Sequence, residues 1–263
     1  MNRPGMLGAG YQITASGINA KRPASDFAAA PCSCYDVWCG TGRESLQINM
    51  TTFAGRPRHY IHETLQSLFS SDWRETNLPV NLIMGSADES HLREYAAHPS
   101  IRIVPWDVEP NDILRWNCTL NKIRALRWGD DEPTLICEDD ILFPPNWFSA
   151  LKLATAEMAD AEYILSLSAA KPDLEKARLV TGKRWVKRYP TFVLQGAQAL
   201  FYPTKALRNK VAEFLQENLT GANGDELIGR YARAHAALYA TKEVLVENVG
   251  WISCFHQDTG RIP

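Results

Sequence analysis

The chain has 263 residues, of which 45% are hydrophobic and 22% are charged, and its formal net charge is −2. This length and composition are typical of a globular protein with one large domain or two small ones. The near-neutral charge argues against a protein whose main partner is a polyanion. No stretch reaches the roughly 18 uncharged apolar residues of a membrane-spanning helix, and the first thirty residues lack the apolar segment of a secretory signal. We therefore expect a cytoplasmic protein without a membrane span.

Residues 1–46 differ from the rest of the chain, because they are rich in Gly, Ala, Ser and Pro and show no sustained periodicity. We predict a poorly ordered N-terminal arm here, followed by a single domain over residues 47–263. Cys32, Cys34 and Cys39 lie close together within this arm. They offer three thiolates to a zinc ion, but no fourth ligand is evident nearby, so a structural zinc site and a plain flexible arm both stay open.

After this arm, strand-like and helix-like segments alternate along the chain. The expected strands cover residues 46–52, 80–84, 101–104, 134–137 and 163–167, and the expected helices cover residues 60–70, 112–128, 146–158 and 225–237. Such alternation predicts an α/β fold, with a Rossmann-like, mostly parallel sheet flanked by helices. In sheets of this kind, ligands bind beyond the carboxyl ends of the strands.

Three adjacent carboxylates follow the expected strand 134–137. Glu138, Asp139 and Asp140 stand between the apolar runs Leu-Ile-Cys and Ile-Leu-Phe. Like charges beside a core are costly unless a cation or hydrogen bonds compensate them. Mg²⁺ and Mn²⁺ favour carboxylate oxygens and leave coordination positions for phosphate, which suits a nucleotide-sugar donor with a diphosphate leaving group. The triplet therefore predicts a metal and donor site, although acidic triplets also occur on solvated loops.

The region around this triplet resembles a known family. Residues 138–141 (Glu-Asp-Asp-Ile), followed by residues 145–148 (Pro-Asn-Trp-Phe), are similar to the Glu-Asp-Asp-Ile…Pro-Asn-Tyr-Phe region of the β-1,4-N-acetylglucosaminyltransferase IV (MGAT4-type) family. Residues 51–68 and 116–121 look like further segments of that family, so the resemblance covers roughly residues 46–155. It implies a single-domain GT-A glycosyltransferase fold, a UDP-sugar donor, Mn²⁺ or Mg²⁺ at a DXD-like motif, and inversion at the anomeric carbon.

The resemblance also implies a role for each matching residue. Asp140 would be the direct metal ligand, and Glu138 and Asp139 would orient the ribose, the sugar and metal-bound water. The residues expected near the nucleotide are Thr51, Thr52 and Arg56.

The match is less close near the C-terminus. Residues 246–253 are similar to the family's Gln-His-Val-Gly segment, whose histidine ligates the metal, but Asn248 stands at that position. Either His256 supplies the missing ligand, or the metal relies on the Asp140 side chain with phosphate and water.

An inverting transfer needs a general base near the acceptor hydroxyl. Asp225 and Glu226 follow a Gly-rich loop at the start of an expected helix. Acidic residues are also favoured in a first helical turn by capping and by the helix dipole. We predict that one of the two is catalytic and prefer Asp225, because the cap position faces the loop.

Two further segments are candidates for acceptor binding. Gln195 and Gly196 interrupt two apolar strands, where a glycine would let a sugar approach the backbone and where an ordinary bulge is an equal alternative. Trp185 lies in the basic stretch 171–190, which would be a loop over the diphosphate, a platform for an anionic acceptor, or a plain solvated loop.

The residues and the resemblance together favour a metal-dependent inverting glycosyltransferase. It would move GlcNAc or another hexose from a UDP-sugar to a hydroxyl of a glycan. The alternatives left open are a phage or bacterial enzyme that glycosylates hydroxylated modified DNA bases, a nucleotidyltransferase, and a non-enzymatic sugar-binding module.

Overall fold

A computed structural model describes most of the chain after residue 45. The described residues are 46–54, 58–76, 78–88, 90–108, 114–158, 162–168, 178–180, 182–188, 194, 196–219 and 223–249. All of them belong to one compact unit, Asp36–Pro263. The predicted N-terminal arm with its cysteines falls outside these ranges except for Leu46, as do three predicted site residues, Arg56, Gln195 and His256.

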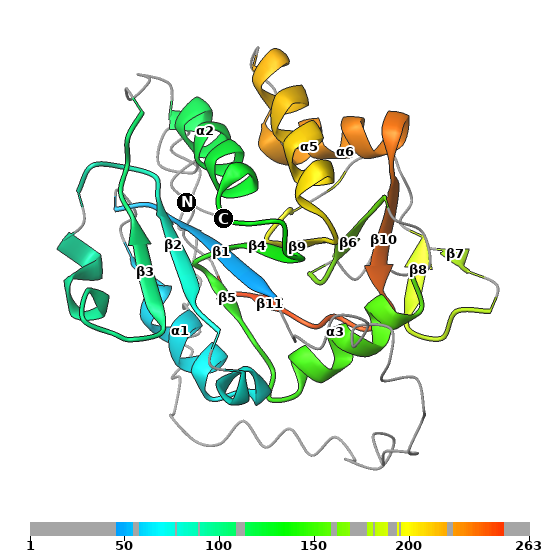
Figure 1. The fold of residues 1–263 in the computed structure, drawn as a ribbon, viewed down its shortest axis with the longest axis horizontal. Coiled ribbons are helices and arrows are strands. Elements are labelled where there is room, and N and C mark those ends of the chain that lie inside the picture. Colours follow the sequence, from blue (N-terminus) through cyan, green and yellow to red (C-terminus); the bar gives the residue numbers. More distant parts are fainter. Residues whose placement is uncertain are drawn as a thin grey trace, which may run out of the picture. The chain divides into compact units, whose positions relative to one another are not determined.

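The centre of this unit is a mixed sheet with the strand order β3-β2-β1-β4-β9-β6-β10-β8-β7 (Figure 1). Its strands are β1 (Gln47–Thr52), β2 (Val80–Met84), β3 (Ile101–Val104), β4 (Thr134–Glu138), β6 (Tyr163–Ser166), β7 (Arg178–Leu179), β8 (Val186–Arg188), β9 (Ala199–Tyr202) and β10 (Ala237–Thr241). Strands β3, β2, β1 and β4 are parallel, and so are β6 and β10. Only β9 and β8 run against the other described strands of the sheet. The sheet is therefore mostly of one direction, as the sequence predicts.

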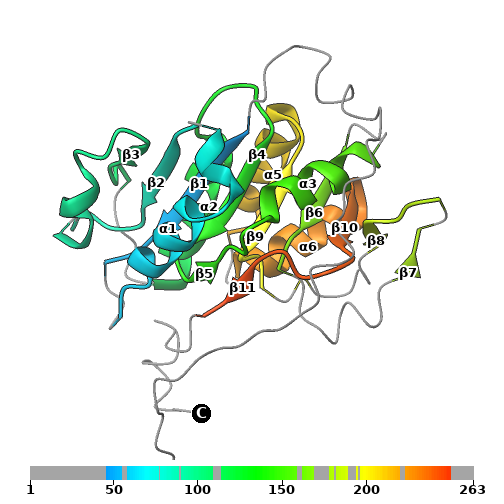
Figure 2. The same cartoon turned by 90° about the horizontal axis from the view of Figure 1, so that it is seen from below.

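Helices cover both faces of the sheet. One face carries α1 (Ile61–Phe69), α3 (Trp147–Ala156) and the short 3-10 helix η3 (Asp72–Glu75), and the other carries α2 (Leu114–Arg127), α5 (Lys205–Glu217) and α6 (Gly224–His235) (Figures 1 and 2). A second 3-10 helix, η4 (Ser90–Tyr95), follows β2. Among the described helices, none combines the length and the apolar character that crossing a bilayer requires.

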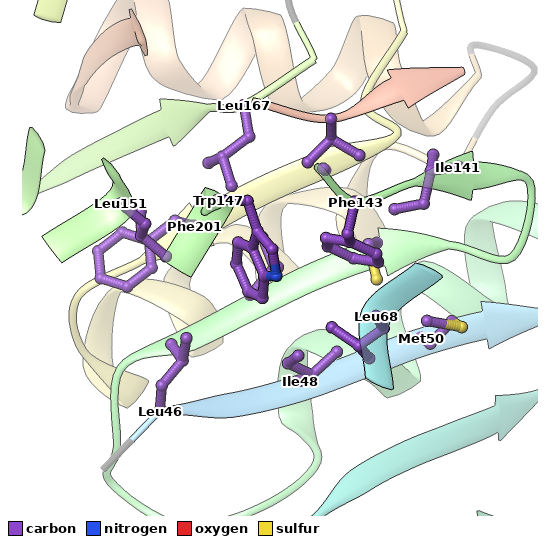
Figure 3. Close-up of a cluster of buried hydrophobic side chains, with 14 of the residues drawn as sticks. Leu46, Ile48, Met50, Leu68, Ile141, Phe143, Trp147, Leu151, Leu167 and Phe201 are labelled. Carbon is purple, nitrogen blue, oxygen red and sulfur yellow. The ribbon is translucent and has the colours of Figure 1, made fainter. Parts of the chain in front are cut away.

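The strands divide their side chains between two cores. In β4, Leu135 and Cys137 face the α1 and α3 side, whereas Ile136 faces the α2, α5 and α6 side, because successive side chains of a strand point to opposite faces. Figure 3 shows the first core, where Phe143 and Trp147 pack over the apolar residues of β1. Burial on both faces explains why these strands are continuously apolar in the sequence.

The observed elements agree with the predicted α/β fold, with two corrections. Strands β2 and β3 have the predicted bounds. The last expected helix was wrong at its end: α6 stops at His235, and Ala237 begins β10 by pairing with Tyr163 of β6. A local helical pattern is overridden there by tertiary strand pairing. Helix α5 was not anticipated, and it is capped by Thr204, whose hydroxyl accepts the N–H of Leu207.

Candidate functional site

Four of the five predicted donor residues, Thr51, Thr52, Glu138 and Asp139, lie at the carboxyl edge of β1 and β4, and the fifth, Arg56, is outside the described residues. These strands are parallel neighbours with Thr51 opposite Glu138, so both strands end at the same edge. Thr51 Oγ1 donates to the carbonyl of Cys137 (3.2 Å), and Thr52 Oγ1 donates to Asp139 Oδ2 (2.6 Å). Thr51 therefore holds the backbone just before the acidic triplet, and Thr52 holds the central carboxylate of the triplet.

Helix α1 supplies a second hydroxyl to the triplet. Thr64 Oγ1 donates to the carbonyl of Asp139 (2.8 Å) and accepts the N–H of Ile141 (3.2 Å). Asp139 is fully buried, and Asp140 keeps only 6% of its surface exposed. The charges of the triplet thus lie at the rim of the core, where solvent screens them weakly.

A histidine pair stands behind Thr52. His91 Nε2 lies 3.0 Å from Thr52 Oγ1, and its ring stacks on that of His59 with centroids 4.7 Å apart. Because the single hydroxyl proton of Thr52 goes to Asp139, His91 Nε2 must be the donor in its contact. Burial lowers the pKa of His91, and the neighbouring His59 lowers it further. His91 Nε2 therefore carries a proton in this contact, and the lowered pKa of the ring favours its neutral form.

The Glu138 side chain turns to the other face of the sheet, toward α2. There Lys122 Nζ lies 3.2 Å from Glu138 Oε1 and also contacts Asp225 Oδ1. Burial alone would lower the pKa of Lys122, but the charges and hydrogen bonds of Asp225 and Glu138 raise it above its usual value. Lys122 is therefore a firmly charged ammonium that joins β4 to α6.

Asp225 and Glu226 have different surroundings, although both lie in the first turn of α6. Asn223 caps this helix, since its Oδ1 accepts the N–H of Glu226 (2.7 Å). Asp225 Oδ2 accepts the N–H of Ala197 (3.1 Å). The Glu226 carboxylate instead pairs with Arg230 one turn further along the exposed surface of the helix. Of the two, Asp225 is the carboxylate that the fold connects to the acidic triplet.

The C-terminal segment of the resemblance runs beside the triplet. Strand β5 (Ile141–Leu142) pairs with β11 (Glu247–Asn248), which places Asn248 opposite Ile141. The N–H of Val249 donates to the carbonyl of Asp140 (2.8 Å). Asn248, at the position that carries a histidine in the resembled family, thus lies beside the backbone of residues 140 and 141 through this strand pairing.

The predicted acceptor residues are not all brought together. Gly196 lies in the turn before β9, with φ +79°, a conformation that favours glycine. The next residue but one, Gln198, accepts the N–H of Glu138 at its carbonyl (2.8 Å), so this turn borders the site. Trp185 precedes β8, which is four strand positions from β4. Its ring is partly buried against the core on the α1 and α3 side.

Sequence reasoning missed Lys122, Thr64 and His91 as parts of this arrangement. A lysine within a helical pattern usually predicts a solvated face, and no motif marks Lys122. Thr64 lies within residues 51–68, one of the segments that look like the resembled family, and this is the one signal that pointed to it. His91 follows β2 in a short 3-10 helix without ligand spacing to other histidines.

Comparison with solved structures identifies the fold. Neither a protein-family profile nor a curated protein sequence matches the chain. S. aureus TarS residues 1–349 is similar in structure with TM-score 0.52 and 13% identity, over 78% of this chain and 60% of that one. The mannosyltransferase PcManGT from Pyrobaculum calidifontis, in complex with GDP-Man and Mn²⁺, has TM-score 0.51 and 19% identity, over 80% and 58% of the two chains.

A third similar structure is GalNAc-T7 with UDP, GalNAc and Mn²⁺, which has TM-score 0.52 and 10% identity, over 78% of this chain and 43% of that one. The chain thus spans about 60% or less of the length of these proteins. At such identities the likeness establishes the architecture and not the substrate. The chain adopts the GT-A glycosyltransferase fold.

Proposed function

We propose that this protein is a metal-dependent inverting glycosyltransferase that moves GlcNAc or another hexose from a UDP-sugar to a hydroxyl of a glycan. The observation that carries the proposal is the meeting of Thr51, Thr52 and the acidic triplet at the carboxyl edge of a GT-A sheet. In open α/β sheets this edge is where ligands bind. The resemblance to the N-acetylglucosaminyltransferase IV family supports UDP-GlcNAc as the first donor to test.

The carboxylates at this edge fit a divalent metal that a phosphate ligand completes. Within the described ranges, no group of three or more His, Cys, Asp or Glu side chains is arranged to hold a metal ion, so the proposed site would have fewer than three protein ligands of this kind there. Mg²⁺ and Mn²⁺ suit such a site, because they prefer oxygen ligands and are held by one or two carboxylates together with phosphates and water. Asp140 would be the protein ligand, with Asp139 beside it. A bound divalent cation would stabilise the negative charge of the departing diphosphate.

The similar structures support the same chemistry in other proteins. PcManGT is in complex with GDP-Man and Mn²⁺, and GalNAc-T7 is with UDP, GalNAc and Mn²⁺. A nucleotide donor and Mn²⁺ are therefore compatible with this architecture. The remaining predicted donor and metal residues, Arg56 and His256, lie outside the described residues and stay predictions.

Asp225 is our candidate for the general base. In the proposed step, the acceptor hydroxyl oxygen attacks the anomeric carbon of the donor sugar, and its proton passes to the Asp225 carboxylate. The bond from the anomeric carbon to the diphosphate oxygen breaks, and its electron pair leaves with the diphosphate. Attack opposite the leaving group inverts the anomeric carbon. Gly196 borders the same site, and we propose that its turn lies on the acceptor side.

Calorimetric titration tests the donor site without knowledge of the acceptor. The wild-type protein would be titrated with UDP-GlcNAc, UDP-Glc, UDP-Gal, UDP and GDP-Man, each with and without Mn²⁺. We expect Mn²⁺-dependent binding of a uridine nucleotide, and we expect Asp140→Ala to weaken it by at least about 100-fold, because loss of a direct ligand should exceed the effect of outer-shell mutations. Asp130→Ala, which removes an exposed carboxylate from the turn before β4, is the matched control and should bind like the wild type.

The outcomes separate the elements of the proposal. Tighter binding of GDP-Man than of any uridine nucleotide would change the proposed donor to a GDP-sugar and leave the proposed glycosyltransferase activity standing. Failure of every nucleotide to bind under any metal condition would overturn the proposed function. Equal affinities for Asp140→Ala and Asp130→Ala would remove Asp140 from the metal site.

The base assignment has its own test, in which water replaces the acceptor. Release of UDP from UDP-GlcNAc with Mn²⁺ would be followed for Asp225→Asn and Glu226→Gln, which are adjacent in the same helical turn. We expect Asp225→Asn to lower the rate by about 100-fold or more, within the range of general-base catalysis, and Glu226→Gln to stay close to wild type. The opposite ranking would transfer the base role to Glu226.

A further inference from the structure

The proposed site contains Glu138, in the acidic triplet on the donor side, and Asp225, the base on the acceptor side, but it assigns nothing to the residue between them. Lys122 of α2 contacts both carboxylates. Its side chain is only 13% exposed, and those of Glu138 and Asp225 are 23% and 24% exposed. Three charged side chains from three separate elements thus share one poorly solvated position.

The position of Lys122 is fixed by its neighbours in α2. Asn121 Nδ2 donates to the carbonyl of Ile83 (3.1 Å), and Arg124 Nη1 donates to the carbonyl of Met84 (2.5 Å). Both bonds attach α2 to the carboxyl end of β2. The lysine therefore projects from a helix that is anchored to the edge of the sheet where the donor site lies.

The start of α6 is shaped to accept the lysine stem. Gly224 is the first residue of this helix, and a Cβ atom added there would lie 3.0 Å from Lys122 Cδ. Such a distance is shorter than an ordinary van der Waals contact. The glycine thus lets the helix approach closely enough for Asp225, the next residue, to reach the ammonium group.

The surroundings of the cluster strengthen its ion pairs. A pocket bordered by Lys122 and Glu138 has an apolar wall, formed by Leu126, Ile136, Leu200, Tyr202 and Ile228. Attraction between opposite charges grows as the local dielectric constant falls. With Oδ1 on Lys122 and Oδ2 on the N–H of Ala197, the Asp225 carboxylate is anchored at both oxygens.

We propose that Lys122 is a positioning residue, which holds Asp225 at a fixed place relative to donor-side Glu138 so that the proton acceptor is correctly placed for the attacking hydroxyl. This inference rests on the proposed function and adds the residue that connects its two halves. It does not require Lys122 to touch the substrate. Its consequence is that loss of the lysine impairs the chemical step more than it impairs donor binding.

The test measures two quantities for each variant: the Kd of UDP-GlcNAc with Mn²⁺ by calorimetry, and the kcat of UDP release with water as acceptor. For Lys122→Met we expect a Kd within about threefold of wild type and a kcat about 100-fold lower, because a displacement of about 1 Å in a catalytic group can have that effect. Lys122→Arg keeps the cation and should recover kcat to within about tenfold of wild type. Arg127→Met removes one cation from an exposed position of the same helix and should change neither quantity.

Lys122→Gln serves as a second variant in case Lys122→Met fails to fold, since it removes the charge but keeps a hydrogen-bond donor. Thermal unfolding would verify that each variant used is folded. A kcat for the folded variant within about threefold of wild type would overturn the inference and leave the proposed function standing. So would a Kd that rises by the same factor as kcat falls, because the lysine would then serve donor binding. A wild-type protein that binds no nucleotide would instead overturn the proposed function itself, and the inference with it.

Discussion

The two sides of the acidic triplet hold their carboxylates by different means. On the α1 side, hydroxyl groups do so: Thr52 donates to the Asp139 carboxylate, and Thr64 donates to its carbonyl. On the α2 and α6 side, the cation Lys122 lies between Glu138 and Asp225. We call these the hydroxyl side and the ion-pair side.

The difference indicates where negative charge remains. A hydroxyl donor stabilises a carboxylate but leaves its charge in place, whereas an ammonium group cancels one unit of it. The negative potential should therefore be strongest around Asp139 and Asp140, on the hydroxyl side. A divalent cation would bind there most favourably, while the ion-pair side keeps Asp225 in place without attracting a second metal.

The largest effect on stability is expected on the ion-pair side. Lys122→Met would leave two poorly solvated carboxylates close together, and we expect the free energy of unfolding to fall by about 3 kcal/mol, as when one partner of a buried pair is removed. Urea denaturation measures this loss. The double variant Lys122→Met/Asp225→Asn should regain part of this stability, because the repulsion between the Glu138 and Asp225 carboxylates is then removed. A loss no larger than that of Arg127→Met would contradict the comparison.

A smaller effect is expected on the hydroxyl side. Thr52→Val removes the hydrogen bond to the Asp139 carboxylate together with the contact to His91 Nε2, and we expect a loss of about 2 kcal/mol, typical of a bond to a charged group. Thr76→Val is the matched control, since the Thr76 hydroxyl donates to a backbone carbonyl, that of Trp73. That substitution should cost about 1 kcal/mol, the value for a neutral bond. Equal losses for the two variants in urea denaturation would mean that the hydrogen bond from Thr52 is no stronger for ending on a charged carboxylate.

The histidine behind Thr52 gives the hydroxyl side a pH dependence. The pKa of His91 is lowered in the folded protein from a reference value of 6.5, chiefly by burial. The unfolded chain therefore binds a proton first as the pH falls, so the contribution of His91 is fully present above about pH 6.5 and declines below it.

His91→Gln should accordingly flatten the fall in melting temperature between about pH 7.5 and pH 5.5, a window that brackets the unperturbed histidine pKa. His62→Gln, at an exposed position of α1, provides the control: His62 Nδ1 lies 3.8 Å from Glu94 Oε1, an ion pair that forms when the ring is protonated, so its loss should not flatten the fall. Parallel slopes for wild type and His91→Gln would refute the assignment of a neutral His91.

The smallest effect is expected for the second carboxylate of α6. Glu226 pairs with Arg230 on the exposed helix surface, so Glu226→Gln should change the free energy of unfolding by no more than about 0.5 kcal/mol. Asp225→Asn, measured in the same urea titrations, should have a larger effect because it removes a contact of Lys122. If the two variants behaved alike, the distinction between the neighbouring carboxylates would be lost.

The elements of the first half of the sheet and the place of the acidic triplet could be predicted from the amino-acid sequence alone. Strands β2 and β3 are short apolar runs bounded by turn residues, and the triplet directly follows the apolar strand β4. These features are local: strand length, apolar content and the end of a buried run can all be read from adjacent residues. The α/β fold followed from their alternation with helical segments.

Which charged side chains meet could not be predicted in this way, because it depends on the packing of elements that are distant in the chain. Lys122, Glu138 and Asp225 are separated by up to 103 positions in the chain, and no local pattern distinguishes this lysine from a solvated one. The antiparallel β9 likewise has an ordinary apolar sequence, and its direction is set by its pairing with β4 and β6. Long-range pairing and burial depend on how the whole chain packs, and so the connection between donor side and acceptor side is a property of the fold.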